Sequence, residues 1–408
     1  MRFRCKRADL AQALTVVSGA VPARTSMPIL SNVRLAADDG ELVLTAMDME
    51  MGLRFAVRDV GIQKGGAALL PAAKLAAIVR DIRDEEVRFD VDGKLATIEL
   101  EGGQFKLAGA DPQDFPQFPA FVEGRAVRIA VEDFRDMVRK TVFAVSSEQG
   151  RYALTGVLFV LRENEARMVG TDGKRMAYVK KKIKGGPKEE VRVIVPPKGL
   201  QLVERIIGGE DEEVAFEFEE TQIKAKTSAG MMFARLVEGS YPNYEDVIPA
   251  NAERKVTVSA ADLEYRLRLA SNMTDEKGRA VKFSFGKDVV KLFSRRITGE
   301  TGEASHEIAA TYDGPEFDVS FNPEFFLDFL KVVTGSGSRD AVEASPEAEE
   351  PKAEGKAKKG KAKAAAKEAA PSAGGTTITL ELRDKSTAGV IRSGRDYTYL
   401  VMPLTIDA

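Results

Sequence analysis

The sequence has few residues that could support cysteine, histidine or metal chemistry. Its 408 residues include one cysteine, Cys5, one histidine, His306, and no tryptophan. One cysteine rules out a disulfide framework, and these two residues cannot build a His/Cys metal cluster. They also disfavour a Ser-His-Asp or Cys-His mechanism. A reducing cytoplasm is the natural compartment for such a chain. With structural roles preferred for the carboxylates discussed below, we expect no catalytic residue, no metal and no cofactor.

Long apolar runs and a large net charge are also missing. The longest candidate, "AALLPAAKLAAIV", is interrupted by Pro71 and Lys74, so it falls short of the roughly 18 residues of a membrane span. A net charge of −3 predicts no partner by itself, and nucleic-acid binding would depend on local groups of basic residues. The basic and then apolar start resembles a signal peptide, but we expect it to be the first copy of a repeat.

That repeat occurs three times. A strand-like alternation leads into an aspartate and an amphipathic helix at residues 3–14, 127–138 and 256–267. A second helix in each copy begins at a proline suited to a first helical turn, namely Pro71, Pro197 and Pro323. Short alternating strands with Gly or Asp-Gly turns surround these helices. The pattern predicts three α+β domains in series, which we place at residues 1–122, 123–250 and 251–408.

Two similar proline-rich strings lie near the ends of the first two copies. "FPQFP" occupies residues 115–119 and "YPNYEDVIP" occupies residues 241–249. Rigid prolines with aromatic residues that can be buried suit an extended connector. We expect these strings to join the three domains.

The third copy is interrupted by residues 335–375. Apart from alanine, the only apolar residue of this insertion is Val342, so burial cannot compensate for the entropy of ordering it. We expect a disordered loop that is acidic first and lysine-rich after. It could be a solvated tether or an additional nonspecific contact with nucleic acid.

Three short stretches could carry chemistry, and for each we prefer a structural interpretation. "GKAKKGKA" (355–362) fits a phosphate-binding loop until Ala362 replaces the required Ser or Thr. The carboxylates of Asp48, Glu50 and Asp172 could hold magnesium or act as acid and base. Each lies beside Thr or Gly at a strand end, where caps and turns are the commoner role.

Basic residues recur on the predicted helices of all three copies. They are Lys74, Arg80, Arg83, Arg135, Arg139, Lys140, Lys198, Arg205, Arg266, Arg268 and Lys331. Singly they are ordinary solvated positions. Spread over three equivalent units, they could form a curved track that neutralises phosphates without reading the base sequence.

The end of the chain, "YTYLVMPLTIDA", is unusually apolar for a tail, and we expect a final strand there. Met402, Pro403 and Leu404 could belong to the core. They could equally line a groove for an apolar partner peptide, a use that the adaptable Met side chain favours.

Five motifs in order resemble one family. They are "RTSMPILSNVRL" (24–35), "TAMDMEM" (45–51), "GTDGKRM" (170–176), "LVEGSYPNYEDVIP" (236–249) and "YLVMPL" (399–404). With the triplication, they make everything except residues 335–375 similar to the bacterial DNA polymerase III beta subunits, the sliding clamps.

The resemblance implies three tandem clamp domains, with helices lining a ring and antiparallel sheets outside. It implies a head-to-tail homodimer that closes around duplex DNA without sequence preference. Such a clamp is a non-catalytic processivity subunit of the polymerase holoenzyme, whose other components include a 3'-5' exonuclease. Its implied partners are DNA, a second copy, the clamp loader, the replicative polymerase, and other polymerases and repair proteins, with no membrane.

The resemblance also assigns three groups of residues. The DNA-facing group is Arg24, Ser147, Glu148, Gln149, Tyr152 and Lys198. The partner-peptide pocket is Arg151, Leu154, Thr171, Gly173, Lys174, Arg175, Met176, Pro242, Val247, Asn322, Phe325, Val401, Met402, Pro403 and Leu404. The dimer contacts include Phe105, Leu107 and Met273. This assignment favours the groove interpretation of the C-terminal segment.

The chain departs from the family pattern in several places. Lys174 occupies a position where the family commonly has histidine, and Asp246 occupies one where it commonly has a basic residue. Ala73 replaces a basic residue that is often found on the DNA-facing surface of the first domain. The last four residues extend past the usual end. Lys174 and Asp246 change the charge at the pocket rim but not its apolar floor.

Two other classes of protein remain as alternatives. A catalytic polymerase or nuclease would need clustered carboxylates that bind magnesium. A monomeric adaptor of three domains would bind proteins but not DNA, and its native mass would distinguish it from a dimeric ring.

Overall fold

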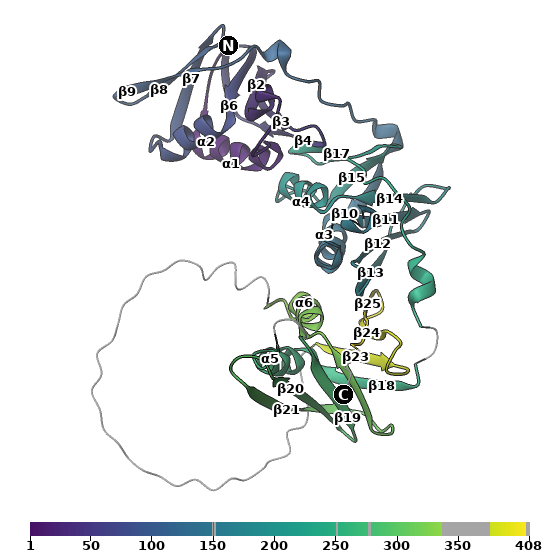
Figure 1. Cartoon of the computed structure of the whole chain (residues 1–408). Helices are drawn as coiled ribbons and strands as arrows, with labels where there is room; N and C mark the ends of the chain where they lie inside the picture. The colour runs from purple at the N-terminus through teal and green to yellow at the C-terminus, as the bar shows by residue number, and fades with distance from the viewer. Residues whose placement is uncertain (149, 151, 250–251, 276–278, 337–375, 405–408) are drawn as a thin grey trace, which may run out of the picture. The chain divides into compact units, whose positions relative to one another are not determined.

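The structure is a computed structural model that describes residues 1–148, 150, 152–249, 252–275, 279–336 and 376–404 (Figure 1). It forms two compact units. The first consists of Met1–Val138, Val145–Met168 and Lys180–Tyr241, and the second of Arg139–Ala144, Val169–Val179 and Pro242–Ala408. The division falls inside the predicted second domain. Residues 337–375 of the predicted insertion lie outside the described residues.

Each predicted repeat contributes two α-helices, as the sequence pattern indicates. The first helices are α1 (Arg7–Val17), α3 (Val131–Thr141) and α5 (Ala260–Ser271), and each has the predicted aspartate in its first turn, where a negative charge favours the helix dipole. The second helices are α2 (Ala72–Asp81), α4 (Pro197–Ile206) and α6 (Pro323–Thr334). Their predicted starts at Pro71, Pro197 and Pro323 are confirmed within one residue.

Short 3-10 segments lie between these elements. They are η1 (Ser18–Ala20), η2 (Pro28–Ser31), η3 (Pro112–Asp114), η4 (Glu123–Arg125), η5 (Val142–Ala144), η6 (Tyr152–Thr155) and η7 (Tyr244–Val247).

The first unit contains two antiparallel sheets. The five-stranded sheet has the order β5 (Gly61–Lys64), β1 (Arg2–Lys6), β7 (Glu86–Asp92), β8 (Leu95–Leu100) and β9 (Gly103–Ala108). The eight-stranded sheet has the order β10 (Val127–Ala130), β15 (Glu213–Phe218), β16 (Gln222–Lys226), β17 (Gly230–Arg235), β4 (Met51–Val57), β3 (Glu41–Met47), β2 (Asn32–Asp38) and β6 (Gly66–Pro71). Because β17 pairs with β4, with Met232 opposite Leu53, this sheet is continuous between the first two repeats.

A further strand pair of the first unit joins β11 (Val157–Arg162) to β14 (Val191–Val195). The strands β12 (Glu165–Thr171) and β13 (Arg175–Lys182) cross the division between the units.

The second unit is built on one antiparallel sheet. From Arg175–Val179 of β13 it continues through β25 (Tyr397–Val401), β24 (Gly389–Ser393), β23 (Thr377–Leu382), β18 (Arg254–Ser259), β21 (Gly302–Thr311), β20 (Val289–Arg296), β19 (Val281–Gly286) and β22 (Phe317–Phe321). The predicted final strand at the C-terminus is therefore confirmed as β25. Helices α5 and α6 pack against each other, and α5 packs on β20 and β21.

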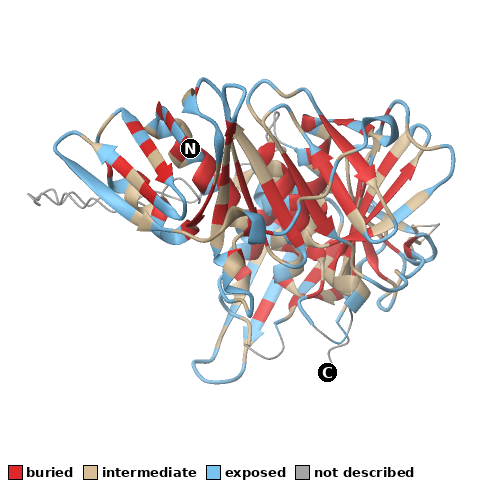
Figure 2. Cartoon of the chain, turned by 90° about the horizontal axis from the view of Figure 1, so that it is seen from above, coloured by how far each residue is buried: buried red, intermediate tan, exposed pale blue. Residues whose placement is uncertain are grey.

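Buried and exposed residues alternate along many of the strands. Along β1 the buried residues alternate with exposed ones, and Figure 2 shows the same alternation of red and pale blue on many strands. One face of each such strand is covered, for example where α1 packs on β3 and β4. The alternation predicted from the sequence arises because only that face leaves water.

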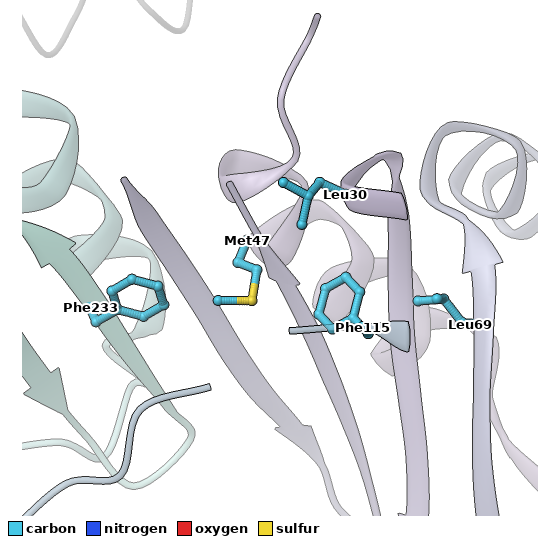
Figure 3. Packing of buried hydrophobic residues seen from close by; sticks show 5 residues of the cluster. All are labelled: Leu30, Met47, Leu69, Phe115 and Phe233. Atoms are coloured by element: carbon cyan, nitrogen blue, oxygen red, sulfur yellow. The ribbon is translucent and has the colours of Figure 1, made fainter. Parts of the chain in front are cut away.

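The "FPQFP" segment covers the opposite face of the eight-stranded sheet. Phe115 is buried in a cluster with Leu30, Met47, Leu69 and Phe233, and Figure 3 shows these side chains spread across neighbouring strands. Phe118 lies edge-on to Phe233, with ring centroids 5.2 Å apart. Each large apolar side chain buried here stabilises the fold by about 1.5–3 kcal/mol. The predicted extended connector with buried aromatic residues is confirmed at this position.

In the described part of the chain, no helix is both long enough and apolar enough to cross a membrane.

Candidate functional site

The turn between β12 and β13 carries five of the predicted partner-binding residues. Asp172 Oδ1 accepts hydrogen bonds from the backbone N–H groups of Lys174 (2.9 Å) and Arg175 (3.0 Å). Gly173 has a φ of 86°, a left-handed conformation that disfavours other residues. Thr171 Oγ1 completes the turn by donating to the carbonyl of Arg175 at 2.5 Å. Asp172 therefore forms a turn, as the sequence analysis prefers.

Asp48 has the same role between β3 and β4. Its Oδ1 accepts from the backbone N–H groups of Glu50 and Met51, both at 2.8 Å. Asp48 and Asp172, which the sequence analysis considered as possible metal ligands or catalytic groups, thus accept hydrogen bonds that stabilise turns. Among the described residues, no group of three or more His, Cys, Asp and Glu side chains could hold a metal ion.

Arg175 connects this turn to α6. Its Nη1 donates to Asp328 Oδ2 at 2.6 Å, its Nε donates to Asp172 Oδ2 at 3.1 Å, and its Nη2 donates to the carbonyl of Phe143 at 3.1 Å. The guanidinium also lies 4.8 Å from the ring centre of Phe325. Burial alone would lower the pKa of Arg175, but its interactions with Tyr399 and Asp328 outweigh burial and raise the pKa. The side chain is 11% exposed, so it works mainly as a support.

The C-terminal segment runs from this turn to β22. The backbone N–H of Met402 donates to the carbonyl of Lys174 at 2.9 Å, and that of Leu404 donates to Ser320 at 2.7 Å. Met402 is 44% exposed and Leu404 is 37% exposed, whereas Val401 is buried. Met402 and Leu404 are therefore surface residues fixed by backbone bonds, and the core alternative fails for both.

Other predicted partner-binding residues of the second unit surround α6 and η7. Asn322 caps α6 by accepting from the backbone N–H of Glu324 at 3.0 Å. Val247, at the end of η7, is 56% exposed. The buried Tyr244 anchors η7 by packing its ring against Tyr178, with the two rings tilted by 32° and their centroids 5.5 Å apart. Pro242 is exposed, Met176 is buried, and Pro403 is partly exposed.

Two of the predicted partner-binding residues are not in this group. Leu154 belongs to the first unit, where its carbonyl accepts from the backbone N–H of Ser146 at 2.9 Å. Arg151 lies outside the described residues.

The rim residues that depart from the family pattern take different roles. Lys174 is exposed, and its backbone carbonyl is used by Met402. Asp246 Oδ2 accepts from Asn243 Nδ2 at 2.7 Å, which fixes this carboxylate within its own turn.

The sequence analysis missed the residues that support Arg175. Asp328 and Tyr399 act through it, and the hydroxyl of Tyr399 also donates to the carbonyl of Phe325 at 2.8 Å. Spacing offered one signal, because Asp328 lies three residues after Phe325 on α6 and so shares its face.

The predicted DNA-facing residues all belong to the first unit. Arg24 is exposed, Tyr152 is 68% exposed, and Ser147 and Glu148 are exposed, while Gln149 lies outside the described residues. Lys198, at the start of α4, forms an ion pair with Asp48 at 3.7 Å.

Most of the basic residues predicted on helices are exposed. Lys140 is the exception, because it lies 3.8 Å from Asp396 and over the ring of Tyr397. The placement of Arg83 on a helix is wrong, since α2 ends at Asp81 before the buried Ile82 turns the chain toward β7.

The predicted dimer residues lie where covered rows of side chains end. On the five-stranded sheet, Phe3, Phe89, Ile98 and Phe105 lie opposite one another on successive strands. The first three are at most 2% exposed, but Phe105, on the edge strand β9, is 43% exposed. This row of side chains therefore extends from the core to β9, an edge strand whose outer side no other described residue covers.

Leu107 follows Phe105 on the same face of β9 and is partly exposed. In the second unit, Met273 follows α5 and is 38% exposed beside Gly302, at the start of β21. Within the described residues, the strand β21 pairs with β18 only at Thr257–Thr311 and Val258–Ala310, which leaves most of this edge of β21 free.

Comparison with known proteins identifies one family along the chain. Models of the DNA polymerase III beta subunit match residues 1–119 (N-terminal domain), 128–243 (central domain) and 245–339 (C-terminal domain). A beta sliding clamp of Chlamydia muridarum is 29% identical over 332 residues, covering 81% of this chain and 90% of the relative. A beta sliding clamp of Staphylococcus aureus is 28% identical over 343 residues, covering 82% and 90%.

Solved structures agree in fold. A DNA polymerase sliding clamp of Pseudomonas aeruginosa superposes with a TM-score of 0.84 at 24% identity, covering 100% of both chains. A sliding clamp of Bacillus subtilis gives the same TM-score, identity and coverage. A sliding clamp of Bartonella birtlesii, solved with griselimycin, has a TM-score of 0.82 at 26% identity.

Proposed function

The chain belongs to the DNA polymerase III beta subunits, the family of sliding clamps, and we propose that it closes around duplex DNA as a head-to-tail homodimer. Sliding clamps are non-catalytic processivity factors, so the function is to keep other enzymes on DNA. The three copies of the clamp domain occupy residues 1–122, 123–250 and 251–408 in this proposal.

The row of core residues that ends at exposed Phe105 carries the proposal. A sheet edge with exposed apolar side chains tends to pair with another chain, which covers both the edge and its apolar surface. The free edge of β21 offers the matching backbone donors and acceptors, and Met273 offers apolar surface beside it. In the dimer, Phe105 and Leu107 contact Met273 of the partner subunit. Because the two surfaces differ, the contact is heterologous, and in our proposal its rotation returns on itself after two copies and so closes a ring.

Charge complements this pairing. The edge strand β9 carries the exposed Lys106, and β21 carries the exposed Glu303, together with Glu307, which also pairs with Lys291 of the same chain. Opposite charges on facing edges favour one register of the two strands.

The proposed DNA contacts are sequence-independent. Arg24, Lys198, Tyr152 and the 147–149 loop would meet phosphate and sugar groups, and the exposed basic residues of the helices would extend this surface. Weak, salt-sensitive contacts allow sliding, whereas tight base contacts would stop it.

The proposed partner surface combines Met402, Leu404 and Val247 on the support given by Arg175. Exposed apolar residues on a backbone that hydrogen bonds fix suit short, otherwise disordered segments, which bind through a few buried anchors. The clamp loader, the replicative polymerase, other polymerases and repair proteins would use this surface in turn, in the cytoplasm.

Salt dependence tests the DNA proposal. Arg24→Gln and Lys198→Gln should each weaken binding to duplexes of any sequence, and each should reduce the log-log salt slope by about one for every phosphate that the variant no longer neutralises. Titration of labelled duplexes at several salt concentrations measures this slope. Arg162→Gln, which removes a partly exposed arginine that pairs with Glu190, is the control. Unchanged slopes for both test variants would contradict the proposed contacts.

A further inference from the structure

Two arginines lie close together on the face of the eight-stranded sheet that carries the connector. Arg34 on β2 is opposite Thr45 on β3, and Thr45 is opposite Arg54 on β4. We call these three residues the arginine row. It lies between Leu69 on β6 and Met231 on β17. With strands about 4.8 Å apart, the two arginine Cα atoms are roughly 10 Å apart, so both guanidinium groups can reach one ligand above Thr45.

The row has unused hydrogen-bonding groups. In the described part of the chain, neither Arg34 nor Arg54 makes an ion pair or a side-chain hydrogen bond. Arg54 Nε and Thr45 Oγ1 are buried without a partner, and Thr45 is 2% exposed. Buried polar groups normally find partners, since leaving one unpaired destabilises a protein.

The connector holds Arg54 in place. Its guanidinium carbon lies 4.7 Å from the ring centre of Phe118, and this cation–π contact holds the group beside the connector. Burial, and then the charge of Arg34, lower the pKa of Arg54. The row therefore brings together like charges that an anion would compensate.

The surroundings favour a carboxylate on a protein over a nucleic acid. Beside the row, Ala36, Val43, Ala56 and Ala67 form a partly exposed strip of small apolar residues. Beyond this strip, the turn from Asp38 to Glu41 is exposed and acidic. A polyanion that covered the row would meet this turn, whereas one side-chain carboxylate would not.

We propose that the arginine row binds a glutamate or aspartate side chain of an acidic protein segment whose small apolar residues lie on the alanine strip. The two guanidinium groups would donate to the carboxylate from either side, and the Thr45 hydroxyl would donate from below. None of these residues belongs to the proposed DNA, dimer or partner-peptide sets, so the site is a separate protein-binding surface.

A methyl-resolved NMR titration of the full chain tests this proposal. The probe is the peptide acetyl-Ala-Glu-Ala-Ala-Glu-Ala-amide, and the same peptide with glutamine at both glutamates is its neutral counterpart. The acidic peptide should shift the methyl signals of Thr45, Ala36 and Ala56, and the neutral one should not. Arg34→Gln and Arg54→Gln should each weaken the affinity about tenfold or more, since each removes a charge-assisted hydrogen bond.

Controls separate this site from general attraction of anions. Arg58→Gln removes an arginine of the same neighbourhood that already pairs with Glu41, and it should leave the affinity unchanged. Thr45→Val keeps the side-chain shape and should weaken binding without unfolding the sheet. Equal shifts from both peptides, or affinity unaffected by Arg34→Gln, would overturn the proposal. Stronger binding of inorganic phosphate or a short DNA duplex at equal ionic strength would also overturn it.

Discussion

At the scale of single residues, exposure distinguishes side chains that complete the fold from those left for partners. Phe105 and Met402 are both apolar and exposed, although Phe105 ends a row of buried residues and Met402 directly follows the buried Val401. Arg175 shows the reverse, because its charge is used almost entirely inside the protein. These differences arise from position and not from residue type.

The first residue-scale prediction concerns the dimer. Phe105→Arg places a charge at the end of an apolar row, where a dimer contact would have to bury it. We expect a folded monomer, with a light-scattering mass half that of the parent. Phe293→Arg changes another partly exposed phenylalanine, on β20, and should leave the mass unchanged. A dimeric Phe105→Arg protein would contradict the assignment.

The second concerns the partner surface. Met402→Ala should weaken binding of a clamp-binding peptide by roughly 1–3 kcal/mol, judged from the apolar area that the longer side chain buries. Calorimetric titration gives the affinity. Met49→Ala removes a more exposed methionine of the first unit and should have no effect. The same peptide affinity in folded parent and Met402→Ala proteins would show that the binding surface lies elsewhere.

Only some of these roles of single residues could be predicted from the sequence. The turn-forming roles of Asp48 and Asp172 follow from neighbouring residues, and local reasoning predicted them. The support of Arg175 by Asp328 joins residues 153 positions apart, and no local pattern encodes such a contact. The arginine row is also invisible in the sequence, because strand register alone brings Arg34 and Arg54 together.

At the scale of elements, the connector is more than a spacer. Lys224 on β16 is 3% exposed, and its Nζ donates to the carbonyl of Ala120 at 2.7 Å and to Glu217 Oε2 at 3.2 Å. The same carboxylate oxygen accepts from the backbone N–H of Val122 at 2.9 Å. A buried ion pair therefore holds the second half of the connector, and the cluster around Phe115 holds the first.

Removal of the lysine of this ion pair should lower the free energy of unfolding. Lys224→Met leaves the fully buried Glu217 without its cation, and we expect unfolding in urea to become easier by about 3–5 kcal/mol. Replacing both residues, by Lys224→Met with Glu217→Leu, should recover only part of that stability, because Glu217 also accepts from the backbone N–H of Val122 and Lys224 also pairs with Glu219.

A control lies on the same strand. Lys226→Met breaks an exposed pair with Glu123 and should cost less than about 1 kcal/mol. If Lys224→Met is no more destabilising than Lys226→Met, the buried pair does not hold the connector.

Helices and strands were the most predictable features. Period and proline position located the six helices well because each repeat buries one face of each helix. The continuous sheet through β17 and β4 was not foreseen, since it joins edges of two different repeats. The failed placement of Arg83 has a local cause, the early end of α2.

At the scale of the whole molecule, the proposed function requires that two copies of the chain close into a ring. Family membership and three clamp domains follow from the matches along the chain. The ring follows only if the edge at Phe105 meets the edge at β21 of a second copy. No residue pattern of one chain encodes that meeting, so the sequence could suggest it only through resemblance.

Retention on DNA of defined topology tests closure most directly. Protein loaded onto nicked circular DNA is separated from free protein at a salt concentration that suppresses direct phosphate contacts, and half of the sample is then linearised by a restriction enzyme. A closed ring should remain on the circles and leave the linear molecules through their free ends. Equally slow escape from circular and linear DNA would contradict encirclement.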